Sequence, residues 1–415
     1  MKSIKSSLIN GSIKAPPSKS MTIRAAAGAL LSQGKTQILT PSQCQDAQTA
    51  FQIIQDLGAT IQPVPQGIKI KGGLNPRKDS IQCGESGLCL RLFTPIASLL
   101  SKELTLKGKG SLSNRPMDMM ESPLKSLGLH CKTQNGLPPI KAKGPLGFGE
   151  VNMDGSLTSQ FLSGLLMALP LCKGNSEIRV QNLNSKPYIL MTLELLHDFG
   201  IKVNKDKGLS KFQIPGNQKY SRAVYPVEGD WSGASFLLAA GAISGKVTVT
   251  GLNMKSAQAD KQILKALHKT GANIQMTENK VTVSRNKLKS LVFDATHCPD
   301  LIPALTVLAC FSPGLSKITG ASRLKYKESN RALSLISEFQ KMGADIWLDK
   351  DKLLIRGGNL EGGKVFSHND HRIAMAEAIA GLRVKKSVRI HKWECVEKSY
   401  PNFFKDLISI GGRIK

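Results

Sequence analysis

LGATIQPVPQGIKIKG (57–72), TGANIQMTENKVTVSR (270–285) and MGADIWLDKDKLLIRGG (342–358) share one pattern. In each stretch a glycine follows an apolar helical segment, and two short alternating segments joined by a polar turn come next. Glycine often ends a helix, and apolar–polar alternation indicates a strand. The same glycine recurs 68 to 72 residues apart, at Gly58, Gly128, Gly200, Gly271, Gly343 and Gly411. A repeat of this kind predicts an array of similar structural units.

Each unit reads as a strand, a helix, a strand, a second helix and a β-hairpin. In the first unit these elements fall at 12–15, 19–31, 35–39, 46–57, 59–64 and 67–71. Five further stretches show the same β-α-β-α-β-β order, at 80–142, 150–215, 222–284, 291–356 and 364–415. The sequence therefore predicts an α/β fold built from six units.

The sixth unit lacks one strand of its hairpin. After Gly411 only GRIK (412–415) remains, and MKSIKSS (1–7) can supply the missing strand. We therefore expect the chain to close on itself, with the N-terminal strand completing the last unit. This arrangement predicts two domains of three units each, one at 15–228 and the other at 1–14 plus 229–415.

The charge balance points to anionic ligands. The chain has 415 residues with 57 Lys and Arg against 30 Asp and Glu, a formal net charge of +27. Such a field attracts anions, among which nucleic acids and small phosphorylated acids are the main classes. Aromatic residues make up only 5% of the chain, which disfavours a stacking platform for single-stranded nucleic acid.

Other compositional features exclude several classes of protein. No run of about 18 apolar residues predicts a membrane span, and the N-terminus lacks the apolar core of a signal peptide. The eight cysteines form no CxxC pair, which suits a reduced, cytoplasmic protein. No HExxH sequence, Cys/His ligand pattern or Walker A loop is present, so we expect no metal, nucleotide or nicotinamide cofactor.

Hydroxyl and basic side chains gather where helices are predicted to begin. First helices are expected near Ser20, Ser86, Thr158, Asp230, Pro299 and Asn369, and second helices near Arg115, Ser185, Lys327 and Lys398. Cations at these starts are Lys19, Arg24, Arg91, Arg115, Lys327, Arg331, Arg372 and Lys398. Helix N-termini offer unpaired N–H groups, and Arg grips carboxylate or phosphate in two-point contacts. A single Ser, Thr or Asp at a helix start is usually only a cap. The prediction of a site for a multiply charged anion therefore rests on the recurrence of hydroxyl and basic residues at equivalent helix starts.

Two carboxylates stand among these cations. Asp300 and Glu328 open the two helices of the fifth unit, and nearby positive charge should keep both ionised. A carboxylate held beside a substrate hydroxyl can act as a general base. The alternative is a purely structural ion pair with Arg or Lys.

Ten motifs, in order along the chain, resemble the 5-enolpyruvylshikimate-3-phosphate (EPSP) synthase family of enolpyruvyl transferases. They are PPSKSMTIRA (16–25), GESGLCLR (84–91), NRPMD (114–118), GSLTSQFLSGLLMALPL (155–171), SKPY (185–188), EGDWSGAS (228–235), PDLIPAL (299–305), KESNR (327–331), NDHRIAMA (369–376) and EKSYPNFF (397–404). The resemblance implies two inside-out α/β domains of three repeats each, with pseudo-threefold symmetry and an active site in the interdomain cleft. It also implies transfer of the enolpyruvyl group of phosphoenolpyruvate to the 5-hydroxyl of shikimate 3-phosphate, without a cofactor, in a monomer.

The resemblance also implies a role for individual residues. The shikimate 3-phosphate contacts would be Lys19, Ser20, Arg24, Thr158, Ser159, Gln160, Ser185, Tyr188, Asp300, Arg323 and Lys327. The phosphoenolpyruvate contacts would be Lys19, Gly87, Arg115, Gln160, Arg331, Arg372 and Lys398. The catalytic groups would be Asp300 as base at the hydroxyl, Glu328 at the methylene proton, and Lys19 and Lys398 close to the transferred protons.

The chain departs from the family pattern at four positions. Glu85 stands where Asn or a small polar residue is common, and Leu88 stands where Thr is usual. Arg323 replaces an Asn found in some members, and Asn330 replaces the usual Asp. The core set of charged residues is intact.

Two alternatives remain open on the sequence. UDP-N-acetylglucosamine enolpyruvyl transferase has a similar fold, but its catalytic cysteine precedes the Arg-Pro motif, where this chain has GSLSN (110–114). A basic nucleic-acid-binding protein is the alternative from another class, and it would lose affinity steeply with salt.

Overall fold

The computed structural model describes residues 1–415, the whole chain. Its internal contacts divide it into two compact units. We call Lys19–Val227 the continuous unit, and Met1–Ser18 together with Glu228–Lys415 the split unit.

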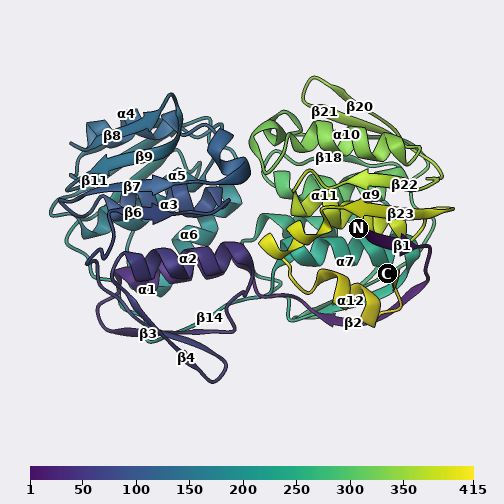
Figure 1. Ribbon diagram of the computed structural model, residues 1–415, viewed down its shortest axis with the longest axis horizontal. Helices are drawn as coiled ribbons and strands as arrows, with labels where there is room; N and C mark the ends of the chain where they lie inside the picture. The colour runs from purple at the N-terminus through teal and green to yellow at the C-terminus, as the bar shows by residue number, and fades with distance from the viewer. The chain divides into compact units, whose positions relative to one another are not determined.

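The continuous unit has three repeats of strands and helices (Figure 1). Its strands are β3 (Lys35–Leu39), β4 (Thr60–Val64), β5 (Gly67–Lys71), β6 (Ser80–Gln82), β7 (Glu103–Lys107), β8 (His130–Gln134), β9 (Leu137–Lys143), β10 (Glu150–Asp154), β11 (Ser176–Gln181), β12 (Asn204–Lys205), β13 (Lys211–Ile214) and β14 (Val224–Pro226). Its α-helices are α1 (Lys19–Leu31), α2 (Gln45–Asp56), α3 (Gly87–Ala97), α4 (Glu121–Ser126), α5 (Gln160–Ala168) and α6 (Lys186–Asp198). Short 3₁₀ segments are η1 (Gly110–Asn114), η2 (Asp118–Met120) and η3 (Leu169–Leu171). The sheets have the orders β14-β3-β5-β4, β6-β7-β9-β8 and β10-β11-β13-β12.

The split unit is built in the same way. Its strands are β1 (Lys2–Lys5), β2 (Ile9–Lys14), β15 (Gly245–Thr250), β16 (Asn273–Met276), β17 (Lys280–Ser284), β18 (Val292–Asp294), β19 (Gly314–Thr319), β20 (Asp345–Asp349), β21 (Lys352–Gly357), β22 (Gly363–Phe366), β23 (Ser387–His391) and β24 (Arg413–Ile414). Its α-helices are α7 (Trp231–Ser244), α8 (Ile263–Lys269), α9 (Ile302–Cys310), α10 (Arg331–Lys341), α11 (His371–Gly381) and α12 (Phe403–Ser409). Its 3₁₀ segments are η4 (Ala259–Gln262), η5 (Pro299–Leu301), η6 (Ser322–Tyr326) and η7 (Trp393–Lys398). The sheets have the orders β16-β17-β15-β2, β18-β19-β21-β20 and β22-β23-β1-β24.

The predicted β-α-β-α-β-β order is confirmed. In the first repeat the hairpin strands β4 and β5 pair antiparallel with Val64 opposite Gly67, close to the predicted bounds. All six repeat glycines have positive φ, between 76° at Gly128 and Gly271 and 121° at Gly58. Glycine adopts this left-handed conformation with little strain, and it ends the helix that comes before each hairpin.

The assignment of two first strands was wrong. The first strand expected for the first repeat is β2, yet β2 pairs parallel to β15 of the fourth repeat. The first strand expected for the fourth repeat is β14, which pairs parallel to β3 of the first repeat. Periodicity marks a strand but does not select its neighbour, because both positions offer the same parallel edge.

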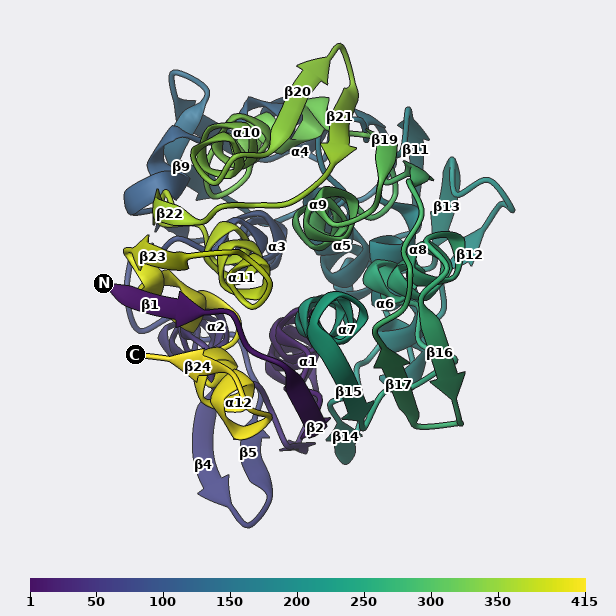
Figure 2. The same ribbon diagram turned by 90° about the vertical axis from the view of Figure 1, so that its right-hand side faces the viewer.

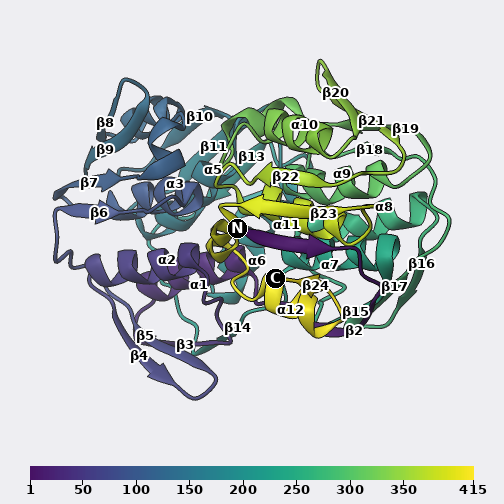
Figure 3. The ribbon, with the colours of Figure 1, turned by 45° about the vertical axis from the view of Figure 1, so that its right-hand side comes forward.

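The N-terminal strand lies in the last repeat. β1 pairs antiparallel with β23 on one side and with β24 on the other, with Ile4 opposite Val388 and Ile414. Figure 3 shows β1 between these two strands, with both chain termini close by. The sixth sheet is therefore complete only with residues from the start of the chain.

The first helices of the repeats form the core of the split unit. Figure 2 shows α7, α9 and α11 side by side with the sheets around them. Every residue of α9 and α11 is buried. The largely apolar α9 has to be enclosed in this way, α11 buries three ionisable residues as well, and the sheets form the outer layer.

Close helix packing also organises the continuous unit. α3 and α5 lie against each other, and a Cβ added at Gly164 of α5 would lie 2.7 Å from the Leu92 carbonyl oxygen of α3. Only glycine permits this approach, which places the N-terminal ends of the two helices next to each other. None of the helices in either unit is both long and apolar enough to span a membrane.

Candidate active site

Most first helices begin where the sequence predicts. α1 begins at Lys19, α3 follows Ser86, and α7 and α11 follow Asp230 and Asp370. Asp230 Oδ2 accepts from the Gly233 N–H over 3.0 Å, so it is the structural cap that the alternative interpretation gave it.

Several second helices begin later than predicted. α4 begins at Glu121 rather than near Arg115, α10 begins at Arg331 rather than Lys327, and α12 begins at Phe403 rather than near Lys398. In each case a 3₁₀ segment stands before the helix. Arg115, Lys327 and Lys398 therefore lie at or just after the ends of these segments, not at the positive end of an α-helix dipole. Their side chains, not helix ends, carry the charge at these places.

Arg331 is the centre of the charged cluster in the split unit. Its side chain has no exposed surface, and three carboxylates surround it. Nε donates to Asp370 Oδ2 over 2.9 Å, Nη1 donates to Asp300 Oδ1 over 2.9 Å, and Nη2 contacts Glu328 Oε2. These carboxylates raise the pKa of Arg331 against the opposing effect of burial. The guanidinium is permanently charged and fixed in orientation.

Asp300 bridges three cations. Its carboxylate lies 2.9 Å from Arg331 Nη1, 3.1 Å from Lys327 Nζ and 3.2 Å from Arg372 Nη2. Burial alone would raise the pKa of Asp300, but Arg372, Lys327 and Arg331 outweigh it and hold that pKa well below its usual range. Asp300 is therefore an ionised carboxylate, as the sequence predicts.

Arg372 combines a fixed position with an unused donor. Its Nη1 lies 2.8 Å from His371 Nε2, and its Nη2 donates to Ser232 Oγ over 2.8 Å. Its Nε is buried and has no hydrogen-bond partner. A buried N–H without a partner is costly, which makes this atom a candidate contact for a bound anion.

Lys398 is held beside the same cluster. Its Nζ donates to the Asn369 carbonyl oxygen over 2.7 Å, and its side chain is buried. Asn369 has a positive φ of 56°, and so does its neighbour His368 at 53°. Two successive non-glycine residues in this conformation are uncommon, and they shape the turn that leads into Asp370 and Arg372.

Asp370 is a candidate site residue that the sequence did not single out. Its carboxylate caps α11 by accepting from the Arg372 N–H over 2.9 Å, and it also accepts from Arg331 and from Ser329 Oγ. It thus links two of the predicted anion-binding arginines. In the sequence Asp370 stands directly before His371 and Arg372, which could have indicated a role in the site. A helix cap was a sufficient explanation for an aspartate at that position.

In the continuous unit, three predicted residues converge at Gly87. A Cβ added there would lie 2.9 Å from Arg115 Nη1 and 3.6 Å from Gln160 Oε1. Arg91 donates from Nη1 to Gln160 Oε1 over 2.9 Å, which orients that amide. Glu85, which departs from the family pattern, is linked to Arg115 through Ser111. Glu85 Oε2 accepts from Ser111 Oγ over 3.2 Å, and Arg115 Nη2 donates to Ser111 Oγ over 3.0 Å.

Lys19 makes an ion pair that the sequence did not indicate. Its Nζ lies 2.9 Å from Asp46 Oδ2, and each side chain is 12% exposed. Asp46 belongs to α2, and its carbonyl oxygen accepts from Cys89 Sγ of α3 over 3.7 Å. This ion pair therefore ties the start of α1 to the two neighbouring helices.

Arg24 is almost fully buried, and its donors bind other groups of the protein. It is 1% exposed, and Nε donates to Thr192 Oγ1 over 2.9 Å while Nη1 donates to the Ser20 carbonyl oxygen over 3.1 Å. Nη2 donates to the Tyr188 carbonyl oxygen over 3.3 Å. Burial lowers the pKa of Arg24 to about 10, so it stays charged at neutral pH. Its contacts join α1 to α6 and position Ser20 and Tyr188.

The other predicted residues lie at the starts of α5 and α6. Thr158 Oγ1 accepts from the Gln160 N–H over 3.2 Å, and the Ser159 carbonyl oxygen accepts from Ser163. Ser185 precedes α6 with a positive φ of 57°. In the split unit, Arg323 Nη1 donates to the Thr296 carbonyl oxygen over 2.7 Å.

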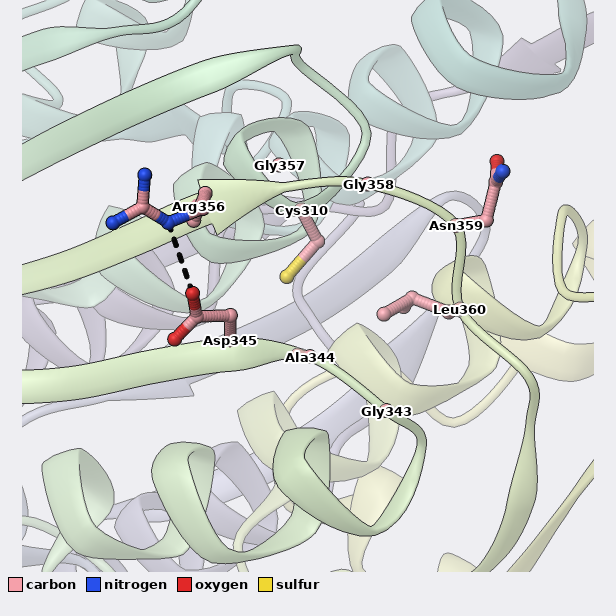
Figure 4. Close-up of a pocket in the computed structure, with 9 residues that line it drawn as sticks. All are labelled: Cys310, Gly343, Ala344, Asp345, Arg356, Gly357, Gly358, Asn359 and Leu360. Atoms are coloured by element: carbon pink, nitrogen blue, oxygen red, sulfur yellow. Dashed lines mark hydrogen bonds and ion pairs between the residues drawn. The ribbon is translucent and has the colours of Figure 1, made fainter.

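Two hollows accompany the split unit. One, of about 500 Å³, runs beside the charged cluster and is lined by Glu328, Asn330 and Asn369 among others. The other, of about 190 Å³, is lined by Cys310, by residues 343–345 and by residues 356–360, with the Asp345–Arg356 ion pair at one side (Figure 4). No residue of the predicted site lines the second hollow. No group of three His, Cys, Asp or Glu side chains is arranged as a metal site.

Comparisons with known proteins show the family of this chain. Residues 4–407 match the family model described as EPSP synthase (3-phosphoshikimate 1-carboxyvinyltransferase). A 3-phosphoshikimate 1-carboxyvinyltransferase of Clostridium kluyveri is 38% identical over 99% of this chain and 97% of its own, and one of Clostridium acetobutylicum is 39% identical over 98% and 96%.

Solved structures show the same architecture. EPSP synthase from Acinetobacter baumannii is similar with a TM-score of 0.82 at 25% identity, covering 100% of this chain and 99% of that one. The enolpyruvyl transferase NikO from Streptomyces tendae is similar in fold, with a TM-score of 0.80 at 15% identity over 100% and 98%.

Proposed function

This chain belongs to the EPSP synthase (3-phosphoshikimate 1-carboxyvinyltransferase) family, and from that premise we propose which of its residues act on each substrate. The reaction transfers the enolpyruvyl group of phosphoenolpyruvate to the 5-hydroxyl of shikimate 3-phosphate and releases phosphate. It is a step of the shikimate pathway, and the two substrates are small anions.

The shikimate 3-phosphate contacts are assigned to the starts of α1, α5 and α6 and to part of the split-unit cluster. They are Lys19, Ser20, Arg24, Thr158, Ser159, Gln160, Ser185, Tyr188, Asp300, Arg323 and Lys327. The hydroxyl groups and N–H groups at these helix starts suit a phosphate, and Lys19 adds a positive charge. Arg24 contributes by holding Ser20 and Tyr188, as its buried contacts indicate.

The phosphoenolpyruvate contacts are assigned to Lys19, Gly87, Arg115, Gln160, Arg331, Arg372 and Lys398. Arg115 Nη1 and Gln160 Oε1 both lie near Gly87, where a side chain would crowd them. Arg372 Nε has no protein partner, so a ligand oxygen can satisfy it. Arg331 has most of its donors engaged by carboxylates and acts mainly by fixed charge.

Asp300 is assigned as the base at the 5-hydroxyl, and the single observation that carries this assignment is its position within 3.2 Å of the cationic groups of Arg331, Lys327 and Arg372. Against the opposing effect of burial, these cations lower the pKa of Asp300, and a base with a lowered pKa takes up a proton poorly. Bound substrate anions compete for Lys327 and Arg372, which weakens their hold on Asp300 and raises its pKa. The substrates thereby make the carboxylate more basic only when both are in place.

The transfer then follows in two steps. The hydroxyl oxygen attacks C2 of the enol while its proton passes to Asp300, and C3 gains a proton to give a tetrahedral intermediate. C3 next loses a proton as the C2–O bond to phosphate breaks, which restores the double bond. Glu328, Lys19 and Lys398 are assigned to the proton transfers at C3. The fixed guanidinium groups stabilise the charge on the departing phosphate.

We also propose that the enzyme is a cytoplasmic monomer with no nucleic-acid or membrane partner and no cofactor. All eight cysteines are free and seven of them are buried, which suits a reducing compartment. Sedimentation equilibrium tests the monomer, and a dimer would contradict it.

A phosphate-release assay tests the activity. We expect release only when phosphoenolpyruvate and shikimate 3-phosphate are both present, and no release with UDP-N-acetylglucosamine in place of the second. Release without shikimate 3-phosphate would contradict the proposal.

A further inference from the structure

Glu85 is a half-buried carboxylate just before α3, and it is hydrogen-bonded to the segment that leads to Arg115. Its Oε2 accepts from the Ser111 N–H over 3.3 Å and from Ser111 Oγ over 3.2 Å. Ser111 belongs to η1 and lies 26 residues further along the chain. Neither Glu85 nor Ser111 is among the predicted substrate contacts. Their bonds nevertheless join two segments that each carry a predicted phosphoenolpyruvate contact, Gly87 and Arg115.

The Ser111 hydroxyl connects this carboxylate to Arg115. Arg115 Nη2 donates to Ser111 Oγ over 3.0 Å. A guanidinium has only donors and an ionised carboxylate has only acceptors. The single hydroxyl hydrogen of Ser111 therefore goes to Glu85, and the hydroxyl oxygen accepts from Arg115. The three side chains form a directed hydrogen-bonded series from guanidinium to hydroxyl to carboxylate, in which each bond strengthens the next.

A local role as a helix cap does not account for Glu85. The cap of α3 is Ser86, whose side chain accepts from the Cys89 N–H over 3.4 Å. The neighbouring loop is instead fitted to the Glu85 carboxylate at Gly110, which has a φ of 55° and where an added Cβ would lie 2.6 Å from Glu85 Cδ. Only glycine permits both this conformation and this approach. The loop before Ser111 is therefore shaped around Glu85.

The support of this series is rigid. The Lys109 N–H donates to the Gly84 carbonyl oxygen over 2.8 Å, which holds the start of η1 against the residues before α3. Leu112, in the middle of η1, is fully buried. Ser111 is therefore held at a fixed distance from Glu85, as the support of a binding group requires.

The guanidinium of Arg115 also reaches the proposed phosphoenolpyruvate contacts. A Cβ added at Gly87 would lie 2.9 Å from Arg115 Nη1 and 3.6 Å from Gln160 Oε1. We infer that Glu85 is a positioning residue for phosphoenolpyruvate binding: through the Ser111 hydroxyl it fixes the Arg115 guanidinium, so that Nη1 stays beside Gly87. The inference rests on the proposed function, since it takes Arg115 to be a phosphoenolpyruvate contact.

Steady-state kinetics of Glu85→Ala, Ser111→Ala and the double variant test this role. We expect each single variant to raise the KM for phosphoenolpyruvate about tenfold, as loss of a charge-assisted hydrogen bond does. We expect kcat and the KM for shikimate 3-phosphate to change less than about threefold. Because both residues act through one series, the double variant should raise the KM for phosphoenolpyruvate no more than the larger single effect. Ser111→Thr keeps the hydroxyl and should have a KM near that of the wild type.

The direction of the change separates positioning from simple repulsion. The negative charge of Glu85 by itself repels an anionic substrate. If repulsion were its main effect, Glu85→Ala would lower the KM for phosphoenolpyruvate. A rise in that KM can only come from the loss of the hydrogen-bonded series.

Glu121→Ala is the matched control. Glu121 is also half-buried in the continuous unit, and its Oε1 accepts from the Thr133 N–H over 2.6 Å and from Thr133 Oγ1 over 2.5 Å. It therefore bonds to a hydroxyl residue in the same two-point manner, but neither residue is linked to a predicted substrate contact. Its KM values for both substrates should equal those of the wild type.

An unchanged or lowered KM for phosphoenolpyruvate in the single variants, or equal rises in the KM values of both substrates, overturns the inference. If Glu85→Ala does not fold, the comparison of Ser111→Ala with Ser111→Thr decides, since only the second keeps the hydroxyl, and equal KM values in the two overturn the inference. A wild type without shikimate 3-phosphate-dependent phosphate release overturns the proposed function. A wild type with that activity and variants with unchanged constants overturn the inference alone.

Discussion

Arg331 Nε donates to Asp370 Oδ2 over 2.9 Å, and neither side chain has any exposed surface. Two further donors of the same guanidinium go to Asp300 and Glu328, which are the proposed base and proton carrier. Arg331, which is proposed to bind an anion, and the proposed catalytic carboxylates are therefore one bonded group. Removing a member of this group should affect both stability and catalysis.

Asp370→Asn should show this double effect. It leaves the buried Arg331 charge without its main counter-ion, which typically costs about 3–5 kcal/mol in stability. Urea unfolding and steady-state kinetics measure the two losses. The matched control is Asp345→Asn, because the Asp345–Arg356 pair is 3.0 Å long but 59% and 61% exposed. That control should cost less than about 1 kcal/mol and leave kcat unchanged. Equal stability losses in the two variants would argue against a structural role for the buried pair.

Asp300→Asn should lower kcat by about 10²–10⁴, the range for loss of a general base, while the protein stays folded. Asp349→Asn is a suitable control, since Asp349 is exposed on β20, away from the cluster. Stopped-flow or steady-state phosphate release measures the effect. A variant with wild-type kcat would remove Asp300 from the mechanism.

Gly87→Ala should weaken phosphoenolpyruvate binding. The new Cβ would lie 2.9 Å from Arg115 Nη1 and 3.3 Å from Arg91 Nη1, so at least one guanidinium has to move. We expect the KM for phosphoenolpyruvate to rise about tenfold or more, with a smaller change in the KM for shikimate 3-phosphate. Gly358→Ala, where a Cβ meets nothing within 4 Å, should leave both constants unchanged. An unaffected KM in Gly87→Ala would show that this surface does not contact the ligand.

Glu377→Gln should stabilise the protein more at pH 8 than at pH 5. Burial raises the pKa of Glu377 well above its usual range, so the folded protein holds this proton more tightly than the unfolded chain does. A raised folded pKa contributes stability that is present below the unfolded pKa and is lost as the pH rises towards the folded pKa. Glutamine does not titrate, so the variant escapes that loss. Urea unfolding at the two pH values measures it, and an equal difference at both would contradict the assigned burial effect.

The repeat could be predicted from the sequence because each of its glycines is required by the local backbone conformation. Gly58 and the five equivalent residues adopt positive φ, which side chains other than glycine rarely do. The pairing of β2 with β15 and of β14 with β3 could not be predicted, since strand propensity carries no information about which edge a strand joins.

The sequence predicted site residues where charged residues recurred at helix starts. It did not predict the residues that contact them from segments without a motif. Arg331, Arg372 and Asp300 stood out by type and place, and the structure brings them together within the split unit. Asp46, which pairs with Lys19, sits in a segment with no motif. This contact depends on the packing of two helices against each other, which a single sequence does not encode visibly.

Phosphorus-31 NMR of the wild-type reaction tests the central claim most directly. With phosphoenolpyruvate and shikimate 3-phosphate both present, we expect one inorganic phosphate to appear for each shikimate 3-phosphate converted. The phosphorus of shikimate 3-phosphate should persist in a new enolpyruvyl product. Inorganic phosphate formed while shikimate 3-phosphate remains unchanged would contradict the account, because it would make the chain a phosphatase and not a transferase.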